Sequence, residues 1–201
     1  MTECGKVVTF PAVPIVETDR LLMRGRTIED FPFFAEIWAD ERVTRYISKH
    51  SQSASETWGK FLKASGHWPL MGYGYWVVEL KATGEVLGEV GFGEFKRELD
   101  PSIFGEPEIG WVLGPASFGK GYATEAARAA ISWGDDRFKQ ELKMSCLIDP
   151  NHTASINVAK KCGFMESFRT NYMDEDVLVL HRNIPKTDSA EFKWGESDAR
   201  K

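Results

Sequence analysis

Cysteine is scarce in this 201-residue chain, which contains only Cys4, Cys146 and Cys162. Their number is odd, they lie far apart, and no CxxC spacing occurs. These features argue against a disulfide framework and a cysteine-based zinc site, and no clustered set of histidine, cysteine and carboxylate residues suggests another metal. We therefore expect a protein without a metal ion, located in the reducing environment of the cytoplasm.

Long apolar runs and an excess of positive charge are also missing. No stretch reaches the roughly 18 apolar residues that a membrane-spanning helix needs. The N-terminal segment contains early acidic residues and no unbroken apolar run, unlike a secretory signal. The formal net charge is -5 and the pI is about 5.5, which argues against a nucleic-acid-binding protein. We expect no membrane and no nucleic-acid partner, and the acidity is compatible with a cationic substrate.

The chain does contain enough apolar sequence for one domain. Hydrophobic residues make up 42% of it, which supports a sizeable single core at this length. No internal repeat or low-complexity block interrupts the sequence. We predict an extended N-terminal arm (residues 1–16), one domain over residues 17–184, and a polar C-terminal tail (residues 185–201).

Hydrophobic periodicity predicts a mixture of helices and strands. The first helix starts at a capping-box-like Thr27–Asp30 pair, and others are predicted at residues 53–65, at residues 122–138 and in a short segment that ends at Gly163. The stretch "HWPLMGYG" is expected to break the second helix. Strands are predicted at residues 18–26, 75–80, 85–95, 108–115 and 142–149, with two more after Gly163. This order predicts an α/β (α+β) domain, with a mixed, mostly antiparallel sheet of about seven strands flanked by about four helices.

The stretch "SFGKGYATEAARAAISWG" (residues 117–134) places two glycines and a lysine directly before a helix. A helix N-terminus presents backbone N–H groups without intrahelical partners and carries partial positive charge, so it can hold an anion. Gly119 and Gly121 would let an anion approach the backbone, and Lys120 adds charge. Alternatively, the turn needs these glycines only for its backbone geometry and binds no anion. Neither a GxxxxGK[ST] loop nor a GxGxxG after a first strand is present, which argues against those two nucleotide-binding motifs.

Three segments together point to a family. "EIGWVLGPASFGKGYATEAARAAISWG", followed further on by "NHTASINVAKKCGF", resembles the GNAT acetyltransferase superfamily. "ETDRLLMRGRTIEDFPFFAEIWAD", near the start, is similar to the branch that includes the ribosomal-protein N-terminal acetyltransferases. The resemblance covers residues 17–184. It implies a GNAT fold and an N-acetyltransferase that moves the acetyl group of acetyl-CoA to a primary amine, on a small molecule or a protein N-terminus, by direct attack.

The resemblance also implies which residues hold the cofactor. In the family, the backbone amides of a Gln/Arg-x-x-Gly-x-Gly/Ala turn bind the pyrophosphate of acetyl-CoA, and the strand before the turn pairs with the pantetheine arm. Here Phe118 replaces the polar first residue of the turn, as aromatic residues do in the branch that the chain resembles. The residues implied for the turn are Phe118, Gly119, Lys120, Gly121, Tyr122, Ala123 and the adjoining Thr124. Those implied for the strand are Trp111, Val112 and Leu113, which plain core packing would also explain.

The loop and helix after the next strand carry the remaining implied cofactor contacts. Asn151 and His152 would contact pantetheine, and Asn157 and Lys160 would reach amide or phosphate groups of the cofactor. His152 is also a secondary catalytic candidate, because histidine titrates near neutral pH. Simple exposure to solvent is the alternative for His152 and Lys160.

Acetyl transfer to an amine needs a neutral nucleophile, so a base assists it. Glu108 is the predicted base, because it opens the strand that leads to the turn, where the family often has a glutamate. Glu89, Glu94 and Glu106 are the alternatives. Each of these carboxylates can equally be solvated or bind a cation at the mouth of the substrate site.

The predicted acid is Ser155. Many family members use a tyrosine that corresponds here to Ala159, so the tyrosine mechanism does not transfer. The resembling branch has a serine near the same helix, and Ser155 matches it. Its hydroxyl would donate to the thioester sulfur, although capping the helix is the role that we favour from sequence.

Two other functions fit parts of the sequence. One is a non-catalytic acyl-CoA-binding or sensor module, and the other is a phosphate or nucleotide enzyme that uses the same glycine turn. The sequence does not identify the acceptor amine. A homodimer formed through the strands at the C-terminal end is a further expectation from the family.

Overall fold

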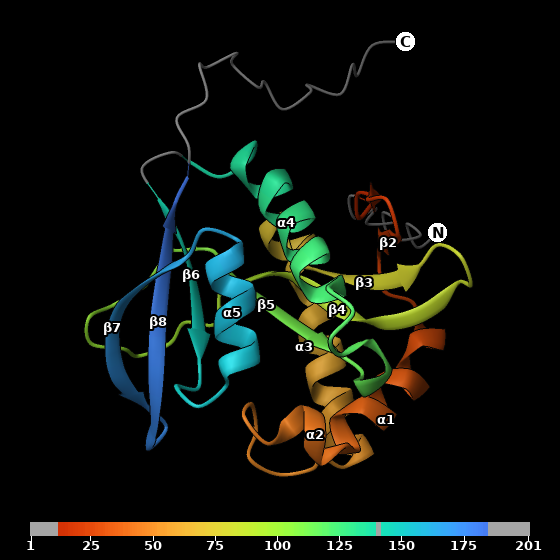
Figure 1. Cartoon of the computed structure of the whole chain (residues 1–201), viewed down its shortest axis with the longest axis horizontal. Coiled ribbons are helices and arrows are strands. Elements are labelled where there is room, and N and C mark those ends of the chain that lie inside the picture. The colour runs from red at the N-terminus through yellow and green to blue at the C-terminus, as the bar shows by residue number, and fades with distance from the viewer. Residues whose placement is uncertain (1–11, 140–141, 185–201) are drawn as a thin grey trace, which may run out of the picture.

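The computed structural model describes residues 12–139 and 142–184. They form an eight-stranded sheet in the order β1-β2-β3-β4-β5-β6-β8-β7, with helices on both faces (Figure 1). The strands are β1 (Val16–Glu17), β2 (Leu21–Arg24), β3 (Tyr75–Leu80), β4 (Glu85–Gly93), β5 (Glu108–Leu113), β6 (Lys143–Ile148), β7 (Met165–Tyr172) and β8 (Glu175–Asn183). The helices are α1 (Phe31–Ala39), α2 (Glu41–Thr44), α3 (Ala54–Met71), α4 (Tyr122–Asp135) and α5 (Thr153–Lys161), with 3-10 turns at Ile28–Asp30 and Pro115–Ser117.

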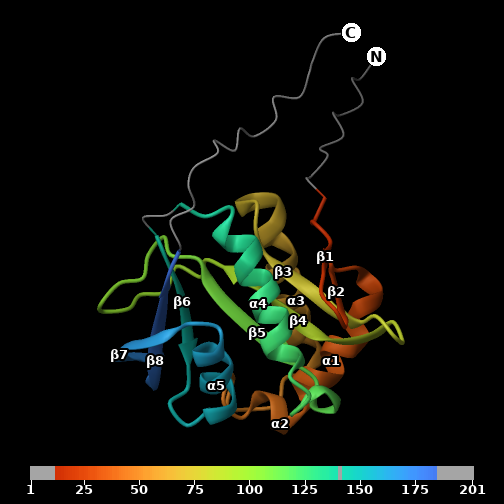
Figure 2. The same cartoon turned by 45° about the horizontal axis from the view of Figure 1, so that its top comes forward.

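The sheet consists of two antiparallel groups joined by one parallel pair. Strands β1 to β5 pair antiparallel in chain order, and β6, β8 and β7 form the second group. The joint is the parallel pair of β5 and β6, which α4 connects as a crossover helix. Figure 2 shows β5 and β6 running apart from this joint.

Side chains alternate between the two faces along each strand, so both faces of the sheet carry side chains that pack against helices. Helices α4 and α5 lie in front of the sheet in Figure 1, and α3 lies behind it. The core on the α4 side contains Trp76 and Cys146 among its fully buried side chains. The core on the α1 and α3 side contains Phe34 and Val77. The neighbours Trp76 and Val77 therefore point to opposite faces.

Strand β5 contributes to both cores. Ile109 and Trp111 pack with the core under α4, and Val112 packs with the core under α1 and α3. By this alternation, Glu108 and Gly110 share the face of Val112. The strand that leads to the glycine turn thus presents its glutamate and its indole to opposite sides of the sheet.

Helix α3 is longer than the sequence predicts. It continues through Pro69 to Met71 and ends at Gly72, whose φ is 73°, so the expected break at "HWPLMGYG" is wrong. Packing overrides the proline here: Trp68 is buried edge-on against Trp76 at 4.8 Å and Trp133 at 5.4 Å between ring centroids. Such aromatic pairs stabilise a fold beyond their area of contact, and they hold the last turn in place.

Other elements and element boundaries can also be compared with the prediction. The short elements β1 and α2 are not predicted, and α4 ends at Asp135 rather than Phe138. Asp40 caps α2 by accepting a hydrogen bond of 2.8 Å from the backbone N–H of Arg42. The predicted start at Thr27 is confirmed: its N–H donates to the carboxylate of Asp30 at 2.8 Å, and the 3-10 turn leads into α1.

Residues 1–11 and 185–201, which make up most of the predicted arm and all of the tail, lie outside the described residues. Within the described ranges, no helix is long and apolar enough to span a membrane. The same part of the chain holds no group of three or more His, Cys, Asp or Glu side chains arranged to bind a metal. Cys146 and Cys162 are both buried free thiols, and Cys4 lies outside the described residues.

Candidate active site

The joint between β5 and β6 opens after a single pair of residues. Glu108 pairs with Ser145, and the Ser145 N–H donates to the Pro107 carbonyl at 3.1 Å. Beyond this point β5 stays paired to β4 as far as Leu113 but has no further partner in β6. The backbone edge from Trp111 to Leu113 is therefore free to pair with an extended ligand, as predicted for the pantetheine arm.

The glycine turn, residues 118–123, follows this edge and starts α4. Gly119 and Gly121 have φ values of 73° and 80°, and Gly121 is the N-cap of the helix without a side-chain cap. A Cβ built on Gly119 would meet no atom within 4 Å. The N–H groups of Tyr122, Ala123 and Thr124 occupy the first turn, where no intrahelical acceptor is available. Both glycines are thus needed for the backbone geometry, and the same geometry leaves an open anion-binding position.

An arginine far away in the sequence lies beside the glycine turn. The Arg20 guanidinium donates to the Glu125 carboxylate at 2.7 Å and to the Lys120 carbonyl at 3.1 Å, and it lies 4.5 Å from the centre of the Tyr122 ring. The Thr18 hydroxyl also donates to Glu125, at 2.6 Å. Although partial burial acts in the opposite direction, these hydrogen bonds lower the pKa of Glu125. Sequence reasoning missed Arg20, because only the folding of β2 against α4 brings it to the turn.

Ser155 lies on α5 opposite the free edge of β5. The indole Nε1 of Trp111 donates to the Ser155 hydroxyl oxygen at 3.0 Å. His152, not Ser155, is the N-cap of α5, so the favoured helix-capping role of Ser155 is wrong. With its oxygen already accepting from Trp111, the Ser155 O–H can donate to a group in the slot between β5 and β6.

The other predicted contacts near α5 already have protein partners in most cases. Asn151 donates to Asp149 at 2.8 Å from its backbone N–H and at 3.1 Å from its side chain. His152 stacks on Tyr46 at 4.7 Å, and burial lowers its pKa although Asp149 opposes the shift. The Lys160 ammonium lies 2.9 Å from Glu166 of β7. Asn157 is exposed on α5.

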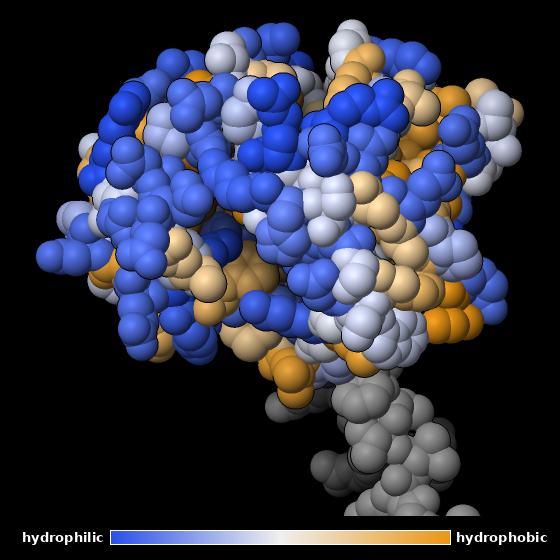
Figure 3. All heavy atoms as spheres, turned by 90° about the horizontal axis from the view of Figure 1, so that it is seen from below, coloured by the Kyte–Doolittle hydropathy of each residue, from blue (hydrophilic) through white to orange (hydrophobic). Residues whose placement is uncertain are grey.

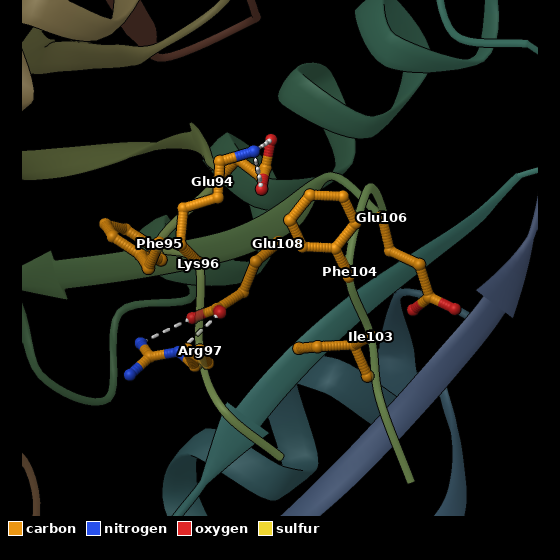
Figure 4. Close-up of a pocket in the computed structure, with 8 residues that line it drawn as sticks. All are labelled: Glu94, Phe95, Lys96, Arg97, Ile103, Phe104, Glu106 and Glu108. Carbon is orange, nitrogen blue, oxygen red and sulfur yellow. Dashed lines mark hydrogen bonds and ion pairs between the residues drawn. The ribbon is translucent and has the colours of Figure 1, made fainter. Parts of the chain in front are cut away.

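Glu108 does not have a free carboxylate. Its two oxygens accept from the Arg97 guanidinium at 2.7 and 2.8 Å, and the residue is buried (Figure 4). Since Glu108 and Trp111 face opposite sides of β5, the predicted base and the predicted acid Ser155 lie on opposite faces of the sheet. A reaction centre in the slot between β5 and β6 would have the base on one side and the acid on the other.

The alternative acids also lie beside basic side chains. Glu89 pairs with Arg26 in the core, and burial raises the pKa of Glu89 although Arg26 opposes the shift. Glu94 pairs with Lys96 at 2.5 Å. Glu106 lies 2.9 Å from the ring of His181. We call Glu89, Glu106 and Glu108, which are all substantially buried, the acidic cluster.

A pocket forms where the loop between β4 and β5 folds over Glu108. Figure 4 shows that the carboxylates of Glu106 and Glu108 point in different directions, Glu106 toward β8 and Glu108 toward Arg97. The pocket is lined by Glu94, Phe95, Lys96, Arg97, Ile103, Phe104, Glu106 and Glu108. Seen from below, the molecular surface is hollowed, with hydrophobic residues in and beside the hollow and hydrophilic residues around it (Figure 3).

Sequence reasoning missed a row of polar side chains that crosses the sheet at the joint. Glu108 pairs with Ser145, and Ser145 pairs with His181, so the three share one face. Ser145 Oγ, both ring nitrogens of His181 and Glu106 Oε2 are buried with no well-aligned hydrogen bond within the described part of the chain. Ser145 lies within the apolar run of β6, and His181 directly follows the apolar run of β8, which is the signal that could have identified them.

Comparisons with known proteins agree with this geometry. A family model for the Acetyltransferase (GNAT) domain matches residues 20–165. The uncharacterized protein YkkB of Bacillus subtilis is 38% identical over 113 residues, which are 55% of this chain and less than two thirds (63%) of that protein. A crystal structure of an acetyltransferase from Agrobacterium tumefaciens is 27% identical, with a TM-score of 0.73 over 89% of this chain and 99% of that one.

The fold is also that of RimL, a ribosomal L7/L12 α-N-protein acetyltransferase solved with coenzyme A. That structure is 15% identical, with a TM-score of 0.67 over 85% of this chain and 98% of the other. Together with the family model, which spans well over half of the sequence, these similarities identify the chain: it belongs to the GNAT acetyltransferase family.

Proposed function

We propose that this chain transfers the acetyl group of acetyl-CoA to a primary amine by direct attack of the amine on the thioester. The observation that carries the proposal is the open edge of β5, which begins at the Glu108–Ser145 joint and leads to the N-terminus of α4. One extended ligand with a diphosphate at one end and amides along its length fits this path. Acetyl-CoA is such a ligand, and when bound it supplies an activated acetyl group.

The residues of this path would hold the cofactor mainly through the backbone. The first-turn N–H groups at Tyr122 to Thr124, together with Lys120, would bind the diphosphate at the open position beside Gly119. The main chain of Trp111 to Leu113 would pair with the pantetheine amides. Phe118 is half exposed and leaves the backbone accessible. Of the contacts predicted on α5, Asn157 fits best because its side chain is exposed, whereas Asn151 and Lys160 are held by Asp149 and Glu166.

Glu108 and Ser155 would handle the protons and the leaving group from the two faces. The new bond joins the amine nitrogen to the acetyl carbon, and the carbon–sulfur bond breaks. Ser155 would donate a hydrogen bond to the sulfur as negative charge develops there. Glu108 can accept the amine proton if the amine, or a water, displaces one of the two Arg97 N–H groups. Much of the rate would come from holding amine and thioester together.

The pocket over Glu108 is the proposed entrance for the acceptor. Lys96 and Arg97 compensate two of its three carboxylates, Glu94 and Glu108, so the pocket does not present a large excess of negative charge. Phe95, Ile103 and Phe104 give it apolar walls. We propose an acceptor with one amine on an apolar or peptide-like body, rather than a polycation, and a protein N-terminus like that modified by RimL is one such acceptor.

Calorimetric titration with acetyl-CoA tests the cofactor path first. The wild type should bind acetyl-CoA, and Gly121→Trp should abolish binding because the indole would fill the approach to the first turn of α4. Gly84→Trp is the matched control: Gly84 has a φ of 72° and no atom within 4 Å of a built Cβ, at the tip of the β3–β4 hairpin. Circular dichroism checks that both variants fold. Binding by folded Gly121→Trp, or no binding by folded wild type, contradicts the proposal.

Turnover then separates enzyme from binding module. Free-thiol release from acetyl-CoA is measured with a panel of spermidine, an aminoglycoside, free amino acids, benzylamine, and peptides beginning with alanine or serine. Acetylation of one class identifies the acceptor. Binding of acetyl-CoA without turnover of any panel member favours the non-catalytic acyl-CoA-binding module. Binding of nucleoside triphosphate but not coenzyme A favours the phosphate or nucleotide enzyme.

A further inference from the structure

Tyr75 reaches from β3 across the sheet to the reaction slot. It pairs with Gly91 of β4, which pairs with Gly110 of β5, so the three residues form a line across the strands. A Cβ built on Gly110 would lie 2.5 Å from the Tyr75 hydroxyl oxygen, and one built on Gly91 would collide with the Tyr75 backbone. Gly110 therefore leaves room for the Tyr75 hydroxyl on β5, and Gly91 allows the backbone of β3 to approach β4 closely.

The hydroxyl stops beside the open part of β5. Gly110 lies two residues beyond the Glu108–Ser145 joint and directly before Trp111. Trp111 and Ser155 occupy the α4 and α5 side of β5, and Tyr75 approaches from the α1 and α3 side. The phenol thus lies close to the Glu108–Ser145 joint, where the slot between β5 and β6 begins to open. It is on the same face of the sheet as the proposed acceptor pocket.

The hydroxyl of this half-buried tyrosine is available to a ligand. Tyr75 is only partly buried, and within residues 12–139 and 142–184 no protein group forms a hydrogen bond with its hydroxyl. Burial raises the pKa of Tyr75, and the nearby carboxylates of Glu108 and Glu89 raise it further against the opposing effect of Arg97 and Arg26. The phenol therefore keeps its proton at neutral pH and stays uncharged.

We propose that Tyr75 positions the acceptor: its hydroxyl oxygen accepts a hydrogen bond from an N–H of the neutral amine and directs the nitrogen lone pair toward the thioester carbonyl. This inference rests on the proposed function. Tyr75 neither gains nor loses a proton in this role, and proton removal remains with the acidic cluster. The role uses an acceptor lone pair of the hydroxyl that no protein group occupies in the described structure.

Tyr75→Phe in the full chain tests the role, because it removes one oxygen and keeps the ring that packs near His67. We expect kcat/KM for the best amine of the panel to fall about tenfold, the size of one lost hydrogen bond. The Kd for acetyl-CoA and the thermal midpoint should not change. Tyr73→Phe is the matched control, since Tyr73 is also half-buried but packs on Phe138 away from the slot. An unchanged kcat/KM in Tyr75→Phe overturns the proposal.

Gly110→Ala provides a second test that does not depend on the size of the first. The added Cβ would displace the hydroxyl at 2.5 Å, but in a Tyr75→Phe background the nearest remaining ring atom lies at 3.5 Å, an ordinary contact. We expect Gly110→Ala to lower kcat/KM about tenfold in the wild type and less than twofold in Tyr75→Phe. If Gly110→Ala lowers kcat/KM by the same factor in the Tyr75→Phe background as in the wild type, the proposal is overturned.

The two proposals fail in different ways. A wild type that binds no acetyl-CoA or acetylates no amine removes the proposed function. If the wild type acetylates an amine and the Tyr75→Phe and Gly110→Ala variants have the same kcat/KM as the wild type, only the proposed role of Tyr75 is rejected.

Discussion

The glycine turn follows the C-terminal end of β5, whereas Glu106 and Glu108 of the acidic cluster lie at its N-terminal end and the third member, Glu89, pairs with Val112 from β4. The two sites are built in opposite ways. The turn offers backbone N–H groups at the surface, and its two essential glycines are separated by only one residue in the sequence. The acidic cluster offers buried carboxylates beside basic side chains: Glu89 pairs with Arg26, Glu108 pairs with Arg97, and Glu106 lies next to the ring of His181. One site is ready to bind an anion, while at the other Glu89 and Glu108 are already neutralised by arginines before any substrate arrives.

This difference assigns separate tasks to the two sites. Backbone donors at a helix N-terminus are fixed by the fold and bind a diphosphate without rearrangement. Buried ion pairs, in contrast, contribute little net stability, but a partner left alone is costly. We therefore expect changes in the acidic cluster to have large effects on stability and chemistry, and side-chain changes around the turn to have small ones. The following predictions test this contrast, from the largest effect to the smallest.

Arg26→Met should lower the free energy of unfolding by about 3 kcal/mol at pH 8, because it leaves Glu89 buried without its cation. Removing Arg26 also removes the group that opposes the raised pKa of Glu89. The folded variant then keeps the Glu89 proton at pH values where the unfolded chain releases it, near the ordinary 4.5. The loss of stability should therefore be small at pH 4.5 and grow as the pH rises.

Urea unfolding at several pH values measures this effect. Arg42→Met is the control, because Arg42 pairs with Asp40 at an exposed site, with 70% of the arginine side chain accessible, and should leave the free energy of unfolding close to that of the wild type. A loss for Arg26→Met that is the same at pH 4.5 and pH 8 would show that Glu89 is not the cause.

Glu108→Gln should lower kcat about 100-fold, the lower range for removal of a general base. The amide preserves the shape of the side chain and one acceptor for Arg97, so the fold and the Kd for acetyl-CoA should persist. Steady-state kinetics at pH 7 measures the change. Glu79→Gln is the control, since Glu79 also forms a partly buried pair with an arginine, Arg24, but lies outside the site. A loss below fivefold would assign Glu108 a structural role as the partner of Arg97.

Ser155→Ala should lower kcat about tenfold, because the leaving sulfur loses one hydrogen-bond donor. The variant also leaves the Trp111 indole without its acceptor, so its thermal midpoint is measured in parallel. Thr153→Ala, an exposed change on the same helix, should leave kcat within twofold. If acetyl-CoA binding weakens while kcat stays constant, Ser155 acts in cofactor binding rather than in leaving-group stabilisation.

The contrast also explains how far the sequence predicts this molecule. The mixed sheet, the order of most elements and the glycine turn follow from local patterns, and the GNAT fold prediction is confirmed. The partners of the charged groups could not be predicted, because Arg20 and Glu125 lie 105 residues apart in the chain. Arg26 and Glu89 lie 63 residues apart, and only the fold brings such pairs together. The extension of α3 through Pro69 likewise depends on Trp76 and Trp133, which pack against Trp68.

Arg20→Met should have the smallest effect on the free energy of unfolding. It tests the comparison between the glycine turn and the acidic cluster directly, because it breaks an arginine–glutamate pair beside the turn instead of in the core. Arg20 is 46% exposed, so we expect a loss of about 0.5 kcal/mol in unfolding free energy at pH 7, and less in about 1 M salt. The pKa of Glu125 is lowered in the folded chain, so the contribution of the pair is present above the ordinary 4.5 and disappears as the pH falls through the lowered value. If urea unfolding shows that Arg20→Met costs as much as Arg26→Met, the turn depends on a side-chain pair as strongly as the acidic cluster does, and the backbone alone does not hold it in its binding geometry.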